Sequence, residues 1–367
     1  MINTSEVDAV ILAGGQGTRL KPLTLSVPKP VLSAACTPLL GYLLLKIALS
    51  GIKHVIISTS YRFEVFKKTF DTGIELGLDI EYINEIEALG TGGAIANAVN
   101  NLRHETTLVF NGDTLSGVNL KDLLNSHKLH SSDITLHLVR VIDPKKFGCV
   151  FTDSVGYVID FTEKPQSFIK KPQSSLEYNQ INGGCYVFKK HILEQIPKGK
   201  TISMEQEVFP NFITRDLTMY GYTDSSYWRD MGTVGDFIKG SADLVQNVAP
   251  SLVLNGNCAE FIANKNTIIS PNALLVGGTS VGKNTKIDSN AYLEGSIVLD
   301  NVYIESNTVI KNSIIGSNVR VRKNTLICDS IVGPESDIGS NCELLHCTRI
   351  WPSTVLLNGS IRHTVNT

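Results

Sequence analysis

The sequence lacks any pattern of paired cysteines. Its seven cysteines are odd in number and scattered along 367 residues, and none forms a C-x-x-C pair. Such a set is typical of reduced, mostly buried thiols, so we expect a cytoplasmic protein. The tightest group, Cys342, His346 and Cys347, lacks the second ligand pair of a zinc site. We interpret these three residues as part of a packed repeat.

A membrane-directed segment and a strong net charge are also absent. The first residues show neither the basic region nor the long apolar region of a signal peptide, and no apolar run approaches the length of a membrane span. The formal net charge is −2, which gives no global attraction to nucleic acid or to an anionic membrane. We therefore expect neither nucleic acid nor membrane as a partner.

The length of the chain predicts two domains, because a single ordinary core rarely extends over 367 residues. The residue pattern changes after Ala249-Pro250-Ser251. We therefore expect a first domain at residues 1–248 and a second at 249–367.

In residues 1–248, short apolar runs rich in Val, Ile and Leu alternate with helical patterns, which predicts an α/β domain with a mostly parallel sheet. One helix is well delimited, with Thr37 as N-cap, Pro38 at the first helical position and Gly51 past its end. The polar stretch Gln166–Tyr178 predicts an exposed loop. The expected strands are Val7–Ala13, His54–Thr59, Ile80–Ile83, Thr107–Asn111, Ile134–Val141, Val155–Thr162, Cys185–Phe188 and Met219–Tyr222.

In residues 249–367, apolar residues recur mainly at every sixth position, with occasional steps of five, and Gly, Asn, Ser and Asp fill the positions between them. A hexapeptide period is typical of short strands wound into a parallel β-helix, in which each aliphatic side chain points into a stacked core. The residues predicted to point inward are Val281, Ile287, Leu293, Leu299, Ile304, Ile310, Ile315, Val321, Ile327, Val332, Ile338, Leu344, Ile350 and Leu356.

Three glycines, Gly14, Gly15 and Gly17, directly follow the first predicted strand. Glycines at this place let backbone N–H groups approach phosphate oxygens, and a helix start adds partial positive charge. The sequence has neither the dinucleotide G-x-G-x-x-G pattern nor a Walker loop here. Arg19 and Lys29 lie close by along the chain, with Lys29 between two prolines. An arginine fork and a lysine point charge predict a phosphate site.

Further motifs follow the glycine loop through the first predicted domain. They are Gly14-Gly15-x-Gly17-Thr18-Arg19-Leu20-x-Pro22-Leu23-Thr24, Pro28-Lys29-Pro30, Leu89–Gly93, Asn111–Asp113, Phe147–Val150, Phe161–Pro165, Asn182–Gly184 and Trp228–Thr233. In content and order these motifs resemble those of the sugar-1-phosphate nucleotidyltransferases. The resemblance implies a Rossmann-like nucleotidyltransferase domain with a mixed, mostly parallel sheet, followed by the family's common C-terminal addition, a left-handed parallel β-helix of hexapeptide repeats.

The resemblance also implies a role for particular residues. Those expected to border the nucleotide are Leu12, Ala13, Gly14, Gly15, Gly17, Thr18, Arg19, Glu85, Gly90 and Thr91. Those expected to contact the sugar phosphate are Gly112, Gly148, Glu163, Lys164 and Asn182. Asp113 and Asp230 resemble the family's Mg²⁺ ligands, and Asp113 follows a predicted strand, which places it at the carboxyl edge of the sheet. Glu205 and Glu207 receive no role.

The implied reaction needs no protein nucleophile. A phosphate oxygen of a sugar 1-phosphate attacks the α-phosphorus of a nucleoside triphosphate, in line with the departing pyrophosphate. Catalysis then consists of positioning and of charge neutralisation by Mg²⁺ and by cationic side chains. The residues expected to be catalytic are Arg19, Lys29, Asp113, Lys164 and Asp230.

The identity of the base and the sugar does not follow from the residues alone. The run Leu138–Pro144, the segment Tyr227–Thr233 and Ile350-Trp351-Pro352 resemble actinobacterial mannose-1-phosphate guanylyltransferases. That resemblance implies GTP and α-D-mannose 1-phosphate as substrates and GDP-mannose as product. The alternatives are a heptose-1-phosphate guanylyltransferase and a thymidylyl- or uridylyltransferase acting on glucose 1-phosphate.

Two functions of other classes are alternatives to this one. A β-helix that also transfers acyl groups usually supplies a histidine base, and this repeat offers only His346 and His363. A non-catalytic regulatory homologue typically loses its metal or phosphate ligands, which are all present here. We further expect the β-helix to serve assembly and stability, with the tail Asn358–Thr367 as a cap, in a homo-oligomer that is most simply a dimer.

Overall fold

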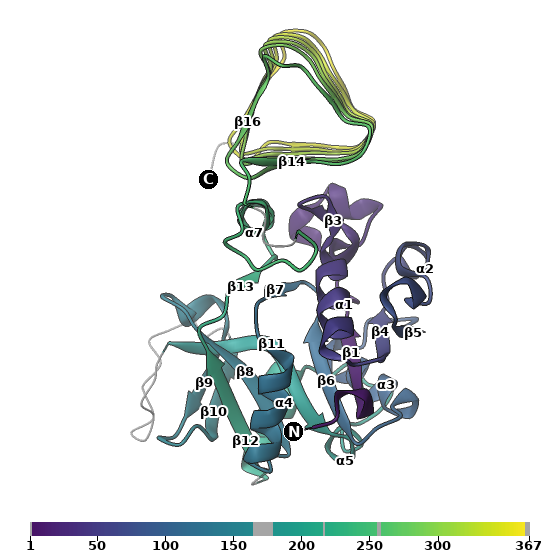
Figure 1. Ribbon diagram of the computed structural model, residues 1–367, viewed down its shortest axis with the longest axis vertical. Helices are drawn as coiled ribbons and strands as arrows, with labels where there is room; N and C mark the ends of the chain where they lie inside the picture. Colours follow the sequence, from purple (N-terminus) through teal and green to yellow (C-terminus); the bar gives the residue numbers. More distant parts are fainter. Residues whose placement is uncertain (1, 164–178, 216, 255–257, 364–367) are drawn as a thin grey trace. The chain divides into compact units, whose positions relative to one another are not determined.

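The computed structural model describes residues 2–163, 179–215, 217–254 and 258–363. It divides into two compact units, which share the chain in an interleaved way (Figure 1). The sheet unit contains Met1–Gly15 and Leu43–Trp228, and the coil unit contains Gln16–Tyr42 and Arg229–Thr367. This division reflects which residues pack together in space and not their order along the chain. The boundary expected between residues 248 and 249 stays a prediction.

The sheet unit is built on four parallel strands in the order β5 (Asp79–Asn84), β4 (His54–Thr59), β1 (Val7–Leu12) and β6 (Thr106–Asn111). Nearly every residue of β1 and β4 is buried, as expected for parallel strands covered on both faces. The order reverses at β1, because β4 lies on one side of it and β6 on the other. Ligands of α/β sheets bind outside the carboxyl ends of strands at such a reversal.

The sheet continues beyond β6 with antiparallel partners, so it is a mixed sheet, as expected. β11 (Gln180–Lys189) is antiparallel to β6, and it also pairs with β8 (Ile134–Arg140) and β9 (Gly148–Thr152). β12 (Met219–Asp224) lies beside β8, and β10 (Val158–Glu163) beside β9.

β11 begins at Gln180 rather than at Cys185, where the sequence predicted its start. The strands β9 and β10 also differ from the sequence-based prediction. β9 was not predicted as a strand, and β10 begins at Val158 rather than at Val155. The reason is an aspartate turn. The Asp153 carboxylate accepts the N–H groups of Val155 (3.0 Å) and Tyr157 (2.9 Å), which holds this segment as the connection between the two strands.

The helices of the described chain are α1 (Leu39–Ser50), α2 (Phe63–Phe70), α3 (Gly90–Ala98), α4 (Leu120–Leu129), α5 (Lys190–Leu193), α6 (Phe209–Thr214) and α7 (Val234–Val245). None of the helices in this part of the chain is both long and apolar enough to cross a lipid bilayer.

The predicted start of the first helix is wrong, because the helix begins later in the sequence than Pro38. Thr37 and Pro38 do not open α1. They form β3 (Thr37–Pro38), which pairs with β2 (Ser33–Ala34). Ala35 and Cys36 both have positive φ, and a two-residue turn of this kind closes a β-hairpin. The hairpin keeps Thr37 extended, and the helix begins only at Leu39.

The rest of the coil unit is a parallel β-helix of three faces (Figure 1). The first face contains β14 (Phe261–Ala263), β17 (Thr279–Val281), β20 (Ile297–Val298), β23 (Ile314–Ile315), β26 (Ile331–Val332) and β29 (Arg349–Ile350). The second contains β15 (Ile268–Ile269), β18 (Lys286–Ile287), β21 (Tyr303–Ile304), β24 (Arg320–Val321), β27 (Asp337–Ile338) and β30 (Val355–Leu356). The third contains β16 (Leu274–Val276), β19 (Tyr292–Glu294), β22 (Val309–Lys311), β25 (Leu326–Cys328), β28 (Glu343–Leu345) and β31 (Ile361–His363). This architecture is consistent with the left-handed β-helix that was expected.

The aliphatic residues predicted to point inward form one continuous core, with a single exception. The prediction that Leu299 points inward is wrong, because Val298 fills that position in the core. The step of five residues falls at the corner between the third face and the first, where Gly295 has positive φ. Strand β20 therefore begins one residue earlier than an even count of six predicts.

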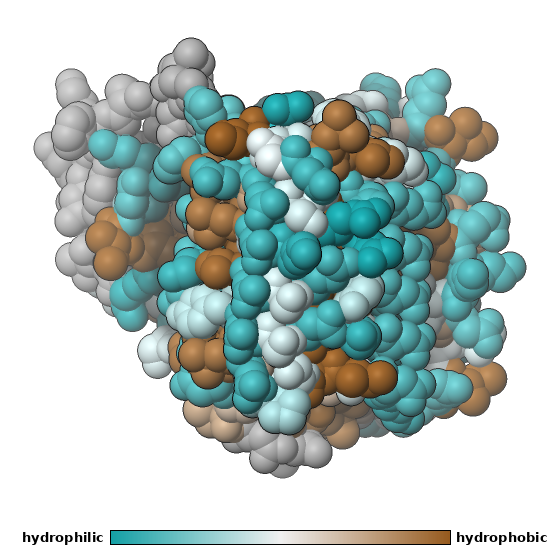
Figure 2. Space-filling view, turned by 90° about the horizontal axis from the view of Figure 1, so that it is seen from above, coloured by the Kyte–Doolittle hydropathy of each residue, from teal (hydrophilic) through white to brown (hydrophobic). Residues whose placement is uncertain are grey.

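Asparagines hold two corners of the coil in a left-handed backbone conformation. Asn290, Asn307, Asn324 and Asn341 all have positive φ, which asparagine tolerates better than most residues. Their side chains form a ladder in which each amide donates to the next at 3.0–3.2 Å. Figure 2 shows rows of hydrophilic side chains along the coil, with hydrophobic side chains in smaller groups.

The prediction that the tail Asn358–Thr367 forms a cap is partly wrong. Its residues Ile361–His363 form β31, which pairs in parallel with β28 and continues the third face. The repeat therefore extends at least to His363.

Candidate active site

The predicted glycine loop begins at the carboxyl edge of the sheet, beside the end of β6. Leu12 and Asn111 lie side by side in the register of β1 and β6, and Gly112 N–H donates to the Leu12 carbonyl at 2.9 Å. Asp113 follows at once and is partly exposed. The structure thus brings Leu12, Gly112 and Asp113 together at the reversal of strand order, where α/β proteins bind ligands.

Contacts with β4 fix the exit of the chain from β1. Ala13 N–H donates to the Ser58 carbonyl at 2.8 Å, and the Ser60 hydroxyl donates to the Gly14 carbonyl at 3.1 Å. Gly15 is exposed, and no atom lies within 4 Å of the place where a Cβ would stand. The backbone at Gly15 is therefore accessible, and hydrogen bonds with Ser58 and Ser60 hold the two residues before it in place.

Gly90 and Thr91 open helix α3 and are held by the segment around Ile202. Gly90 has a φ of 70°, and a Cβ there would stand 2.6 Å from the Ile202 carbonyl oxygen, so glycine is required at this position. Gly92 N–H donates to that carbonyl at 2.8 Å. The Thr91 hydroxyl donates to Glu205 at 2.8 Å. Sequence reasoning missed this partner, since 113 residues lie between the two.

Glu85, which was expected to read the base, is buried with an exposed fraction of 5%. Ser58 donates to one of its carboxylate oxygens at 2.6 Å, and the Leu89 N–H donates to the other at 3.2 Å. Glu85 therefore joins the end of β4 to the start of α3. Its contact with a base stays a prediction.

Three residues expected to contact the sugar lie on adjacent strands. Gly148 is paired with Glu163 across β9 and β10. Ile181 is paired with Cys149 across β11 and β9, which puts Asn182 at the level of Gly148. The Asn182 amide donates to the Tyr186 hydroxyl at 2.7 Å and accepts the Gly184 N–H at 3.0 Å. Lys164, the cation predicted beside this group, lies outside the described residues.

The remaining predicted residues belong to the coil unit. They lie on the segment Gln16–Tyr42, called the loop segment below, and on the segment that precedes α7. Gly17 has a φ of 60°, and its carbonyl accepts the Thr24 hydroxyl at 2.9 Å. Thr18 and Arg19 are exposed, whereas Lys29 is 5% exposed. The loop segment thus folds back on itself around Gly17.

Arg19, Lys29 and Asp230 form an ionic group within the coil unit. The Lys29 ammonium lies 3.8 Å from the Asp230 carboxylate, whose side chain is 31% exposed. A Cβ on Gly232 would stand 2.6 Å from the Arg19 guanidinium and 2.7 Å from the Asp230 carboxylate. The residue types predicted for phosphate and metal binding are therefore neighbours here, although Arg19 and Asp230 are far apart in the sequence.

The two predicted metal ligands lie in different units, Asp113 in the sheet unit and Asp230 in the coil unit. No group of three or more His, Cys, Asp or Glu residues that could hold a metal occurs within the described ranges. Mg²⁺ does not need such a cage, because it keeps several waters and takes one or two carboxylates together with substrate phosphates. Each of the two aspartates is partly exposed and can supply one carboxylate of this kind.

A half-buried lysine, which the sequence analysis did not identify, contacts the strand that follows Asp113. Lys46 on α1 donates to the carbonyl of Ser116 at the end of β7 (Thr114–Ser116), at 2.8 Å. Burial lowers the pKa of Lys46 to about 8. This cation ties the helix to the strand that follows the candidate metal ligand.

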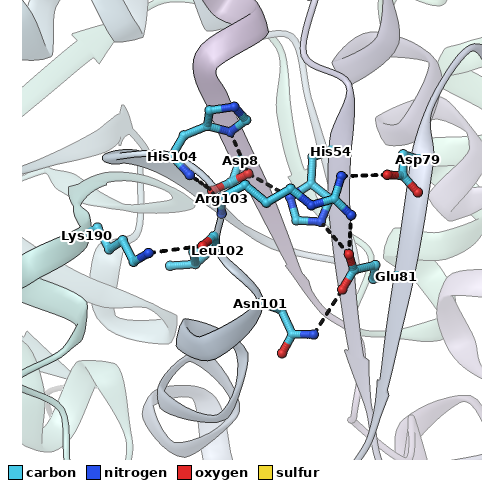
Figure 3. A network of polar contacts seen from close by, with 9 residues as sticks. All are labelled: Asp8, His54, Asp79, Glu81, Asn101, Leu102, Arg103, His104 and Lys190. Carbon is cyan, nitrogen blue, oxygen red and sulfur yellow. Dashed lines mark hydrogen bonds and ion pairs between the residues drawn. The ribbon is translucent and has the colours of Figure 1, made fainter.

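The opposite, amino edge of the sheet carries a second polar network (Figure 3). Asp8 on β1 is fully buried and lies 2.7 Å from His54 Nδ1 and 2.9 Å from His104 Nδ1. His54 also contacts Glu81 at 3.2 Å, and Glu81 pairs with Arg103. Burial raises the pKa of Asp8, but hydrogen bonds from both histidines outweigh it and hold that pKa below 3.8. This edge is remote from the glycine loop along β1, so we assign it to stability.

Comparison with known proteins agrees with this geometry. The sequence model of the nucleotidyl transferase family matches residues 8–247, and that of the GMPPB C-terminal domain matches residues 257–332. The chain is 50% identical to "Mannose-1-phosphate guanylyltransferase" of Mycobacterium tuberculosis over 98% of both proteins. It is 35% identical to "Mannose-1-phosphate guanylyltransferase catalytic subunit beta" of Drosophila pseudoobscura pseudoobscura over 66% of this chain and 65% of that protein.

A solved structure also resembles the chain. The crystal structure of HddC from Yersinia pseudotuberculosis complexed with GMP-PN superposes with a TM-score of 0.54 and 29% identity, covering 65% of this chain and 99% of that one. The glycine loop, Asp113 and the mixed sheet all fall within the matched residues 8–247, which make up well over half of the sequence. This chain belongs to the nucleotidyl transferase family.

Proposed function

We propose that this protein is a mannose-1-phosphate guanylyltransferase, which joins GTP and α-D-mannose 1-phosphate to give GDP-mannose and pyrophosphate. The observation that carries the proposal is the 50% identity with the M. tuberculosis protein of that name over 98% of both chains. The GMP-PN bound to the Yersinia relative supports a guanine nucleotide as one substrate.

The proposed reaction is a single in-line displacement. A phosphate oxygen of mannose 1-phosphate forms a bond to the α-phosphorus of GTP, while the bond between that phosphorus and the α–β bridging oxygen breaks. The bonding electrons leave with pyrophosphate. Such a reaction depends on positioning and on neutralising the charge of the phosphates.

The sheet unit would hold the guanosine and the sugar. Gly14 and the open backbone of Gly15 would border the nucleotide, together with Leu12, Ala13, Gly90 and Thr91. Glu163 would accept hydrogen bonds from hydroxyl groups of the sugar, since it ends β10 next to Gly148 and at the level of Asn182. The Glu85 carboxylate, bonded to Ser58 and Leu89, would set the position of the Gly90 turn near the base.

Cationic side chains would neutralise the phosphates. Arg19 is exposed and offers two parallel donors to the triphosphate. Lys29 is almost fully buried beside Asp230, so its charge is fixed in place. Lys164 would pair with the phosphate of the sugar. Thr18 and Gly17 would complete the loop around the triphosphate.

Asp113 and Asp230 would hold Mg²⁺, which supplies charge neutralisation to the phosphate oxygens when it is bound. The chain itself would supply two carboxylates, both of which are partly exposed to solvent. Lys29 beside Asp230 balances one of these charges before substrate arrives. A site of this kind binds the ion mainly together with the nucleotide.

The test is a matrix of nucleoside triphosphates against sugar 1-phosphates, with pyrophosphate release as the readout. We expect release in the presence of Mg²⁺ only from GTP with mannose 1-phosphate, and none without the sugar phosphate. A preference for dTTP or UTP with glucose 1-phosphate, or for a heptose 1-phosphate, would contradict the substrate assignment. No release from any pair would favour a regulatory homologue, and acetyl-CoA turnover would indicate an acyltransferase.

We further propose that the protein is a cytoplasmic homo-oligomer, most simply a dimer. Each of its seven cysteines is a free thiol, which suits a reducing compartment. The last coil exposes four large apolar side chains, Trp351, Val355, Leu357 and Ile361, by 54–78%. An apolar open coil end suits a contact between subunits. Light scattering should give a dimer mass for the full chain and a monomer mass for Val355→Asp.

A further inference from the structure

The loop segment Gln16–Tyr42 packs with the coil, although its sequence continues the first strand of the sheet. It carries Arg19 and Lys29, the two cations proposed to bind the triphosphate. The residues proposed to bind the sugar, such as Glu163 and Asn182, lie instead in the sheet unit. The two cations proposed for the triphosphate therefore lie in the coil unit, whereas the residues proposed to hold the guanosine and the sugar lie in the sheet unit.

The coil unit anchors the loop segment at its hairpin. The tip of the hairpin between β2 and β3 contacts helix α7 and the coil. Ala35 N–H donates to the Ser241 hydroxyl oxygen at 2.8 Å, and Ser241 lies 3.4 Å from the Ser280 hydroxyl on β17. The Cys36 thiol donates to the Val281 carbonyl at 3.2 Å. Ser241 and Ser280 are both almost fully buried, so these bonds have little competition from water.

A second anchor lies at the other end of the β-helix. Arg349 on β29, in the last coil, donates to the carbonyl of Lys21 at 2.8 Å. Lys21 lies two residues after Arg19. The first coils thus hold one end of the loop segment, and the last coil holds the part of it that adjoins the arginine.

We propose that Arg349 on the β-helix and Ser241 on helix α7 are positioning residues, by which the coil unit sets the affinity for the nucleoside triphosphate. This inference rests on the proposed function. Arg349 fixes the backbone beside Arg19, and Ser241 fixes the hairpin that follows Lys29. Neither residue is among those proposed to contact the substrates. The β-helix therefore contributes to nucleotide binding as well as to assembly, which the sequence did not predict.

The coil supplies a matched control for Arg349. Arg322 on the same β-helix makes a bidentate pair with Asp337, at 2.9 Å and 2.7 Å. This pair lies on the outer surface of the second face, and the loop segment takes no part in it. If loss of any coil arginine acted only through stability, Arg322→Ala should have at least the effect of Arg349→Ala.

The experiment measures KM for GTP, KM for mannose 1-phosphate, kcat and the melting temperature for both variants of the full chain. We expect Arg349→Ala to raise KM for GTP roughly fivefold, as the loss of one hydrogen bond would, and to leave KM for mannose 1-phosphate unchanged. Arg349→Lys should restore part of the affinity, because lysine also donates. Arg322→Ala should leave both KM values at the wild-type level.

Ser241→Ala tests the second anchor, and we expect it to raise KM for GTP in the same way, with some loss of melting temperature. A wild-type KM for GTP in Arg349→Ala, an equal rise in both KM values, or the same rise in Arg322→Ala would overturn the inference. Wild-type protein that does not turn over GTP and mannose 1-phosphate would refute the proposed function instead. The inference is then judged by the melting-temperature increase that the best-binding nucleoside triphosphate gives, which Arg349→Ala should reduce and Arg322→Ala should not.

Discussion

The β-helix and the sheet unit place interacting residues in different ways. In the coil, a residue contacts its equivalent 17 residues further along, as Asn290 contacts Asn307. In the sheet, Asp8 contacts His54 at a separation of 46 residues and His104 at 96. The coil repeats one environment many times, whereas each environment in the sheet occurs once. Substitutions in the coil should therefore have repeatable effects, and those in the sheet should have individual ones.

The largest effect is expected at the two proposed Mg²⁺ ligands, one of which lies in each unit. Asp113→Asn in the sheet unit and Asp230→Asn in the coil unit should each lower kcat by roughly a hundredfold or more, because each would remove a carboxylate charge from the proposed Mg²⁺ site. Circular dichroism and melting temperature should stay unchanged, since both side chains are partly exposed.

Asp122→Asn on the exposed face of α4 is the control for these variants, and it should keep normal turnover. Near-normal turnover in Asp113→Asn or in Asp230→Asn at saturating Mg²⁺ would remove that aspartate from the mechanism.

Equivalence within the coil can be tested with two core residues. Ile310 and Ile327 are fully buried and occupy the same position in successive coils. Ile310→Ala and Ile327→Ala should each lower the free energy of unfolding by about 3 kcal/mol. Urea denaturation followed by circular dichroism measures both. A difference between them of more than about 1 kcal/mol would show that the coils are not equivalent.

A smaller effect is expected from the polar network at the amino edge of the sheet. Asp8→Asn should lower the free energy of unfolding by about 2 kcal/mol, because it removes the charge that two histidines contact. The pKa of Asp8 in the folded protein lies below its ordinary value of 3.8. Its contribution is therefore complete above that pH and is lost as the pH falls through the folded-state pKa.

Melting temperatures measured at falling pH test this prediction. The wild-type protein should lose stability steeply below about pH 4, and Asp8→Asn should follow a flatter curve there. Parallel curves would mean that Asp8 carries no stabilising charge.

The smallest effect is expected at a corner of the coil. Asn307 has a φ of 57° and takes part in the asparagine ladder. Asn307→Ala should cost about 1 kcal/mol, because alanine tolerates this conformation poorly. Asn307→Gly removes the same side chain without the backbone penalty and should cost less. Thermal denaturation of the two variants separates the contribution of the ladder from that of the backbone.

The sequence was most informative where the physics is local or repeated. The six-residue period predicted the β-helix and nearly all of its core, because every coil imposes the same demand on the same position. It failed only at Leu299, because the five-residue step falls at the corner after Leu293 and places Val298 in the core. The order of buried strands likewise predicted the α/β sheet, and Gly14 and Asp113 were expected at its carboxyl edge from strand ends alone.

Tertiary structure alone decided which distant residues meet. No local pattern links Thr91 to Glu205, Asp8 to His104 or Lys21 to Arg349, since each pair depends on how whole strands and coils pack. The sequence by itself therefore determined the kinds of elements and the chemistry available at their ends. Packing decided that the loop segment with Arg19 and Lys29 belongs to the coil unit, because burial and hydrogen bonding act through space and not along the chain.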